Sequence, residues 1–318
     1  MDYQRPRIEY YRQRTYSEKM NVTFDFIREN WKPLLKYTFY LIMPVCLVQT
    51  LVTNSLLTTY LGFVSSNSTG NVSLGESLSS NMYSFIFNYG IALFCNLIGS
   101  AILSGLVYAM MQTYDTRTNG LHGVIIDDFK ENLIRNAWRC IGISFFLLFL
   151  FIIVVCFAAF LAVTVSMVSL VLTIPLVLFF ILCLIPMMLV VPVYLFERDI
   201  TFFGAFEKAW KLGTRTLAGL LGFAIVLGII SNVIQTVVSI PWYFVVFARS
   251  IFELAQESTT NPSLTYKIAV YLLGLAQTYG VYITSILTII GLAFQYFHAR
   301  EKVDGITIES NIENFSQL

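Results

Sequence analysis

The residue types that most often carry out chemistry are few in this chain and lie far apart in its sequence. It has two histidines, His122 and His298, and five cysteines in or beside apolar runs, without CxxC spacing. With so little histidine a metal site built on imidazole is not expected, and thiols in this pattern are typical of buried apolar side chains rather than of disulfides. No Ser-His-Asp, HExxH or Walker-type pattern is present. The sequence therefore predicts no catalytic residue, no metal, no cofactor and no enzyme.

The long apolar runs contain amides and prolines but no Asp, Glu or His. Ionisable groups at membrane depth mark proton relays and ion coupling, so their absence from the sequence of these runs disfavours both functions. Amides in apolar helices usually bond to a neighbouring helix, and prolines usually make packing kinks; a substrate path is the alternative interpretation of both. The residues that such a path would use are Pro175, Pro186, Pro192, Asn232 and Gln235.

A short charged island, Glu197–Arg215, separates two apolar runs. At helical periodicity Phe202, Phe206 and Trp210 fall on one side of it, and Lys211 falls on the other. We expect a helix of this kind to lie in the membrane surface, where aromatic and basic side chains are also suited to binding a partner protein.

Related stretches precede two other apolar regions. Phe26–Lys32 and Leu133–Arg139 align with the island, because each ends in a Trp followed by a base. The chain is therefore predicted to repeat one unit three times, a cytoplasmic interfacial helix followed by a transmembrane hairpin. The candidate residues for partner contacts are Trp31, Trp138, Phe202, Phe206, Trp210 and Lys211.

Composition favours an integral membrane protein, because 57% of the residues are hydrophobic and 12% are charged, whereas about a quarter of a soluble domain is charged. The formal net charge of +1 gives no reason to expect a nucleic-acid partner. We predict an all-α fold in three parts, namely a cytoplasmic basic arm and interfacial helix at 1–33, six spans within 34–297, and a cytoplasmic tail at 298–318. The predicted spans are about 34–61, 82–112, 140–163, 168–196, 217–247 and 267–297.

The positions of the basic residues predict the orientation. Eighteen of the 20 Lys and Arg fall on one side of such a six-span chain, and only Arg249 and Lys267 fall on the other. Since Lys and Arg concentrate on the cytoplasmic side of membrane proteins, both termini and all three interfacial helices are assigned to the cytoplasm.

This topology can be tested by thiol labelling of intact cells. In a cysteine-free background, single cysteines at Ser66 and Thr259 are expected to react with an impermeant reagent, whereas one at Thr118 is expected to stay unlabelled. Labelling at Thr118 would refute the orientation.

Two stretches carry a resemblance to a known group, LVVPVYLFERDITFFGAFEKAWKLGTRTLAGLLGFAIVLGIISNVI and RTYSEKMNVTFDFIRENWKPLLKYTFYLIMP. They resemble bacterial, Bacteroidota-type multi-span proteins related to the membrane domain attached to some glycerophosphoryl diester phosphodiesterases. The phosphodiesterase itself is a separate soluble barrel, so the resemblance transfers no catalytic residue. It implies a multi-pass protein of the bacterial inner membrane that serves as an accessory subunit.

We therefore expect a non-catalytic inner-membrane scaffold or accessory subunit of a membrane complex. Its expected partners are the lipid bilayer and other membrane or membrane-proximal proteins, with a homo-oligomer as a further option. The alternative function is a transporter or channel for a lipidic or uncharged solute.

Overall fold

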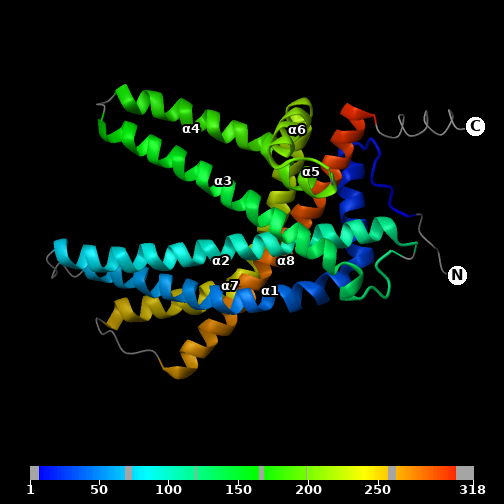
Figure 1. The fold of residues 1–318 in the computed structure, drawn as a ribbon. Coiled ribbons are helices and arrows are strands. Elements are labelled where there is room, and N and C mark those ends of the chain that lie inside the picture. Colours follow the sequence, from blue (N-terminus) through cyan, green and yellow to red (C-terminus); the bar gives the residue numbers. More distant parts are fainter. Residues whose placement is uncertain are drawn as a thin grey trace, which may run out of the picture. The chain divides into compact units, whose positions relative to one another are not determined.

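The structure is a computed structural model that describes residues 7–68, 74–118, 120–164, 168–197, 199–256 and 263–305. Every secondary-structure element in these ranges is helical (Figure 1). The elements are α1 (Tyr16–Ser68), α2 (Leu74–Thr116), the 3-10 helix η1 (Ile126–Asp128), α3 (Lys130–Thr164), α4 (Val168–Met187), α5 (Val190–Phe196), α6 (Phe202–Arg215), α7 (Leu217–Gln256) and α8 (Leu264–Asp304).

Within the described part of the chain, six helical segments are long and apolar enough to cross a membrane. This confirms that the described part of the chain is helical, with six apolar segments of the length that a multi-pass membrane protein requires. Many large apolar side chains on these helices are exposed, which is expected where lipid replaces water as the solvent. Helix α8 continues to Asp304, so the first residues of the predicted tail are helical, and residues 306–318 lie outside the described ranges.

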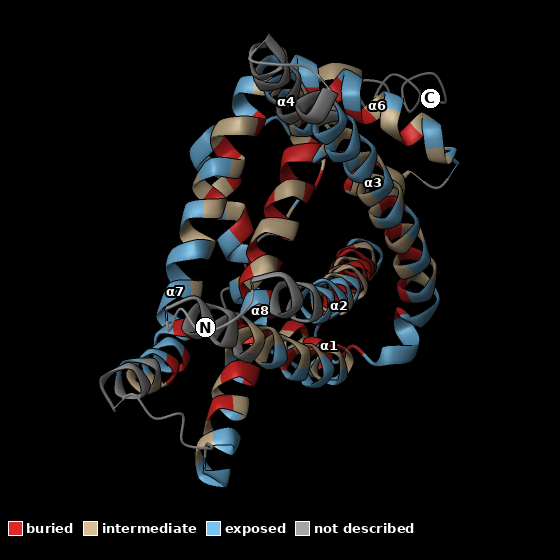
Figure 2. Ribbon diagram, turned by 90° about the vertical axis from the view of Figure 1, so that its left-hand side faces the viewer, coloured by how far each residue is buried: buried red, intermediate tan, exposed pale blue. Residues whose placement is uncertain are grey.

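The chain forms two compact units. Unit 1 comprises Met1–Leu34, Ser104–Ile229 and Ile286–Leu318, and unit 2 comprises Leu35–Leu103 and Ile230–Ser285. Helices α3 to α6 belong entirely to unit 1, whereas α1, α2, α7 and α8 contribute residues to both units. Many of the buried residues of unit 1 belong to α2 and α8, two of the helices on which Figure 2 marks buried residues in red.

The same backbone break precedes three of the long helical segments. Asn30 inside α1 has φ −113° and ψ 17°, Phe129 before α3 has φ −130° and ψ 1°, and Thr216 before α7 has φ −121° and ψ 19°. These breaks do not follow the Trp-base endings, because Trp31 directly follows its break while Trp138 and Trp210 lie inside α3 and α6. A Trp next to a Lys or Arg favours a position at the membrane interface, but this pair does not determine where the helix breaks.

The stretch before α3 differs from its predicted form. The spacing of Ile126, Phe129 and Leu133 predicts one helix, but the structure has a 3-10 turn that ends at Phe129, and α3 starts at Lys130. Asp128 accounts for this local structure, because its carboxylate accepts the Ile125 backbone N–H at 2.8 Å. Side chains of this kind compete with helix by bonding to nearby backbone groups.

The fourth predicted span is interrupted. Helix α4 ends at Met187, and α5 begins at Val190. Between them, two backbone hydrogen bonds join residues three apart, from Met188 N to Ile185 O and from Leu189 N to Pro186 O. Pro192 explains the position of the break, because a proline ring clashes with the carbonyl four residues before it, here that of Met188. In the first turn of α5 the same proline is tolerated, since no intrahelical bond is required there.

Candidate functional site

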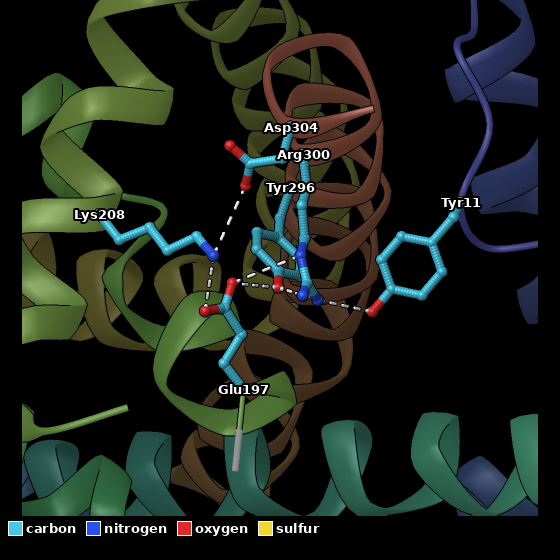
Figure 3. A network of polar contacts seen from close by, with 6 residues as sticks. All are labelled: Tyr11, Glu197, Lys208, Tyr296, Arg300 and Asp304. Carbon is cyan, nitrogen blue, oxygen red and sulfur yellow. Dashed lines mark hydrogen bonds and ion pairs between the residues drawn. The ribbon is translucent and has the colours of Figure 1, made fainter. Parts of the chain in front are cut away.

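A connected polar cluster of unit 1 is built around Glu197, which follows directly after α5 (Figure 3). Its Oε2 accepts a hydrogen bond from Lys208 Nζ of α6 at 2.8 Å, and its Oε1 accepts one from the Tyr296 hydroxyl of α8 at 3.0 Å. Arg300 Nε lies 3.5 Å from the same Oε1, and Lys208 Nζ lies 3.5 Å from Asp304 Oδ2. We call these five residues, together with Tyr11, the Glu197 cluster.

The charges of the cluster compensate one another. Two carboxylates face two bases, and the Glu197 side chain is only 12% exposed. Burying a carboxylate is costly unless it is paired and hydrogen-bonded, and both conditions are met here. Each charged group is engaged by an opposite charge, so this arrangement is suited to holding α5, α6 and α8 in register rather than to attacking a substrate.

The N-terminal arm, residues 7–15, joins the same cluster. Arg300 Nη1 donates to the Tyr11 hydroxyl at 3.0 Å. The neighbouring Tyr10 is buried, its ring stacks on Phe297 at a centroid distance of 4.8 Å, and its hydroxyl donates to Met111 O at 2.8 Å. Burial raises the pKa of the Tyr10 phenol well above its usual range, so the neutral form is favoured in the docked arm.

Two arginines of this arm donate hydrogen bonds to backbone carbonyls of unit 1. Arg7 donates to the carbonyls of Tyr114 and Asp115, which belong to the last turn of α2 and lack partners within the helix. A cation at a helix C-terminus is also favoured by the helix dipole. Arg14 donates to the Tyr10 carbonyl at 2.9 Å and thereby stabilises the fold of the arm itself.

Helix α6 is fixed to its neighbours on one face. Thr201 caps its start by accepting the Gly204 N–H at 3.2 Å. Ala205 and Ala209 are buried, and Gly213 packs so closely on Pro186 that an added Cβ would lie 2.5 Å from the proline Cα. Because α6 begins at a capped residue and packs on the broken span, it is held in a defined position.

The predicted partner residues fall into two groups. Trp31, Trp138 and Trp210 are exposed by 51%, 70% and 42%, and Lys211 is exposed as well. The two phenylalanines of the prediction, Phe202 and Phe206, are only partly exposed, because both rings contact Phe146 of α3, at 5.4 and 5.1 Å between centroids.

Between those two phenylalanines, Phe203 is 71% exposed. Its ring also contacts Phe146, at 6.0 Å between centroids, so this ring contact does not by itself distinguish the three phenylalanines, and their exposure depends on how α6 packs on its neighbours. Phe203 is therefore the aromatic residue that sequence reasoning did not select for this surface.

The predicted path residues belong to different units. Pro186 and Pro192 are buried in unit 1, and Pro175 is an exposed residue of α4. Asn232 and Gln235 belong to unit 2.

Gln235 is nevertheless part of a polar contact in unit 2. Its Nε2 donates to Ser239 Oγ at 3.1 Å and to the Gln277 carbonyl at 3.2 Å, while its buried Oε1 has no hydrogen-bond partner. Asn232 is exposed on the same helix.

Two central groups of unit 1 were missed by the sequence interpretation. Glu197 is the first charged residue after the charge-free run from Cys140 to Phe196, and that position was the available signal. Lys19 is 3% exposed, donates to Gln295 Oε1 at 2.6 Å and lies 5.1 Å from the Phe223 ring centroid. No pattern in the sequence distinguishes this buried lysine from a solvated one.

Among the side chains that the structure describes, no three His, Cys, Asp or Glu gather as a metal site would require. Comparisons of the chain with protein-family models, with curated proteins and with solved structures gave no match.

Proposed function

We propose that the protein is a non-catalytic scaffold or accessory subunit of a membrane complex, and that α6 presents its partner surface. The observation that carries this proposal is the two-sided character of α6. One face is buried against unit 1, and the other exposes Phe203, Trp210 and Lys211. Exposed aromatic residues such as Phe203 and Trp210 are among the groups enriched at binding surfaces.

The proposal includes the membrane arrangement expected from the sequence. It has three hairpins, each preceded by a cytoplasmic interfacial helix, in a bacterial inner membrane with both termini inside. The excess of Lys and Arg on one side of the six spans supports this orientation. The resemblance to the membrane domain of glycerophosphoryl diester phosphodiesterases, carried by the island that contains α6, agrees with an accessory role.

Affinity purification after gentle detergent extraction tests the partner surface. The double variant Phe203→Ala with Trp210→Ala is expected to lose co-purifying subunits by at least about tenfold, because aromatic anchors dominate such interfaces. Phe244→Ala is the matched control, since Phe244 of α7 is 73% exposed and belongs to unit 2.

Equal recovery of partners with both variants would refute the assignment of this surface. A wild-type protein that purifies without any stoichiometric partner would refute the scaffold function itself. Quenching of Trp210 by lipids brominated near the headgroups, with no effect of the double variant on partners, would show that this face of α6 binds lipid instead.

A transporter or channel for a lipidic or uncharged solute is the second candidate function. The unpaired Oε1 of Gln235 favours it, because a buried acceptor without a partner in a membrane helix is costly and a polar solute would satisfy it. Solute flux into liposomes that decreases with Gln235→Leu would support this function.

A further inference from the structure

Two polar atoms of opposite hydrogen-bonding type face the same glycine of unit 2 without partners. They are the donor Trp242 Nε1 and the acceptor Asn54 Oδ1, and both are buried. The position where a Cβ of Gly274 would stand lies 3.1 Å from Trp242 Nε1 and 3.4 Å from Asn54 Oδ1. Trp242 is only 6% exposed, so its N–H has no access to bulk solvent. The two polar atoms and the glycine come from three helices, α1, α7 and α8.

The surroundings of this point are apolar. The Trp242 ring packs on Val246 and Val270, with Leu57 and Leu273 against the same cluster. Thr50 Cγ2 lies 3.1 Å from the Gly274 Cβ position, and the Thr50 hydroxyl is bonded to Thr278. In such an environment an unbonded donor and an unbonded acceptor are both unfavourable, and nearby protein hydroxyls are already engaged.

We propose that this point is a binding site for the hydroxyl group of a small uncharged molecule. A hydroxyl oxygen accepts one hydrogen bond and donates another, so it satisfies Trp242 Nε1 and Asn54 Oδ1 together. A carboxylate has no proton for Asn54 Oδ1, an ammonium has no acceptor for Trp242, and any ion would have to give up its hydration to enter this apolar environment. The paired requirement therefore selects alcohols over ions. We call the position between Trp242 Nε1, Asn54 Oδ1 and Gly274 the Gly274 site.

The location suits a solute that enters from the water phase. The next charged residue after Trp242 on α7 is Arg249, and the last one before Gly274 on α8 is Lys267. At a rise of 1.5 Å per residue, Arg249 lies about 10 Å along α7 from Trp242, and Lys267 lies about 10 Å along α8 from Gly274. The site therefore lies a short way inside the apolar layer on the side of these two charges. Tyr266, whose ring is covered by the Arg249 guanidinium at 4.5 Å, packs against the Trp242 cluster at this end.

A second buried acceptor without a hydrogen-bond partner, Gln235 Oε1, belongs to the same pair of helices, α7 and α8. Gln235, Ser239 and Trp242 fall at i, i+4 and i+7 of α7 and so share one face. Gln235 Oε1 lies 3.2 Å from the Cβ position of Gly280, another buried glycine of α8. Glycines on α8 thus accompany unpaired polar atoms at two levels of the same helix pair. The Gly274 site would give the second candidate function, transport of an uncharged solute, a specific binding site, and its role rests on that proposed function. Binding of a solute there can be measured whether or not the protein transports it.

The test uses the full-length protein with Trp31, Trp138 and Trp210 replaced by Phe, so that Trp242 is the only indole. The protein is reconstituted in nanodiscs and titrated with 1-butanol, and the indole emission is followed because it shifts to longer wavelength when the N–H gains a hydrogen bond. A saturable red shift is expected. Methyl propyl ether, an isomer that accepts but cannot donate, is expected to bind at least about tenfold more weakly, because it leaves Asn54 Oδ1 unpaired.

Two variants and one control locate the response. Gly274→Ala places a methyl group against Trp242 Nε1, and Asn54→Leu removes the acceptor; each is expected to weaken the butanol response at least about tenfold. Gly90→Ala is the matched control, because nothing lies within 4 Å of its added Cβ and it too is a helical glycine of unit 2.

Three results would overturn the site. The first is a linear, unsaturable response, which is what partition of butanol into the lipid produces. The second is an equal response to the ether or in the Asn54→Leu variant. The third is an indole that is already hydrogen-bonded in water and does not respond to butanol, since this would mean that water or Asn54 itself satisfies Trp242 and that no solute binds. A saturable butanol response without solute flux would retain the site and reject the transporter function.

Discussion

Replacing Glu197 by glutamine is expected to destabilise the protein more than any other conservative change in unit 1. The glutamine keeps the size of the side chain but removes the charge that compensates Lys208 and Arg300. Removing one partner of this partly buried ion pair is expected to lower the free energy of unfolding by about 1–3 kcal/mol, because the remaining charges of Lys208 and Arg300, 27% and 22% exposed, stay partly desolvated. The loss is measured as a shift of the unfolding transition in detergent with increasing SDS.

Glu207→Gln is the control for this measurement. Glu207 is an exposed residue of the same helix, α6, so the same chemical change there is expected to alter stability by less than about 0.5 kcal/mol. If the two variants unfold at the same SDS fraction, the Glu197 cluster contributes nothing to stability. The Glu197→Gln variant is also expected to expose Tyr11 to solvent, because Arg300, which donates to the Tyr11 hydroxyl, loses its compensating negative charge.

Replacing Gly213 by alanine is the second change with a large expected effect. The new Cβ would lie 2.5 Å from Pro186 Cα and 2.7 Å from its Cβ, distances that require the backbone of α4 or α6 to move. Overpacking of this kind costs about 1–3 kcal/mol, and here the position of α6 on the broken fourth span is expected to change with it. Partial proteolysis near Thr201 measures that displacement, and SDS unfolding measures the loss of stability.

The matched control is Gly219→Ala, because Gly219 is also helical and nothing lies within 4 Å of its added Cβ. Alanine is the better helix former by up to about 1 kcal/mol, so this variant is expected to be as stable as the wild type or slightly more stable. A Gly213→Ala protein that behaves like Gly219→Ala would show that α6 is not held against Pro186.

Much of the architecture was predictable from the sequence, because the bilayer imposes a strict requirement on apolar runs. A charge-free stretch as long as Cys140–Phe196 is too long for one span of about 20 residues, and it forms α3, α4 and α5. One proline of the fourth span also had a predictable effect, since Pro192 cannot follow a helical carbonyl at Met188, whereas Pro175 and Pro186 lie inside α4. These inferences depend on local chemistry and on solvent, and neither requires knowledge of the neighbouring helices.

The location of the candidate sites was not predictable in the same way. Phe202, Phe203 and Phe206 are chemically equivalent in the sequence, and all three rings contact Phe146, at 5.4, 6.0 and 5.1 Å between centroids. Phe203 is nevertheless 71% exposed while the other two are partly buried, and only the packing of α6 on its neighbours decides this. Glu197 and Arg300 are distant in sequence, and Asn54, Trp242 and Gly274 come from three separate helices. A periodic pattern specifies which side of a helix is apolar, and it contains no information about which helix covers that side.

By itself, the sequence determined that the chain is an all-helical membrane protein with interrupted apolar runs, because burial of backbone polar groups in lipid leaves helices as the accessible solution for such runs. Tertiary structure alone decided that the basic arm docks onto α2 and α8, that Glu197 is compensated by Lys208 and Arg300, and that Trp242 Nε1 and Asn54 Oδ1 meet at Gly274. The physical reason is that pairing of buried charges and hydrogen-bonding groups depends on distances between segments that are far apart in the chain, and composition and periodicity do not encode those distances.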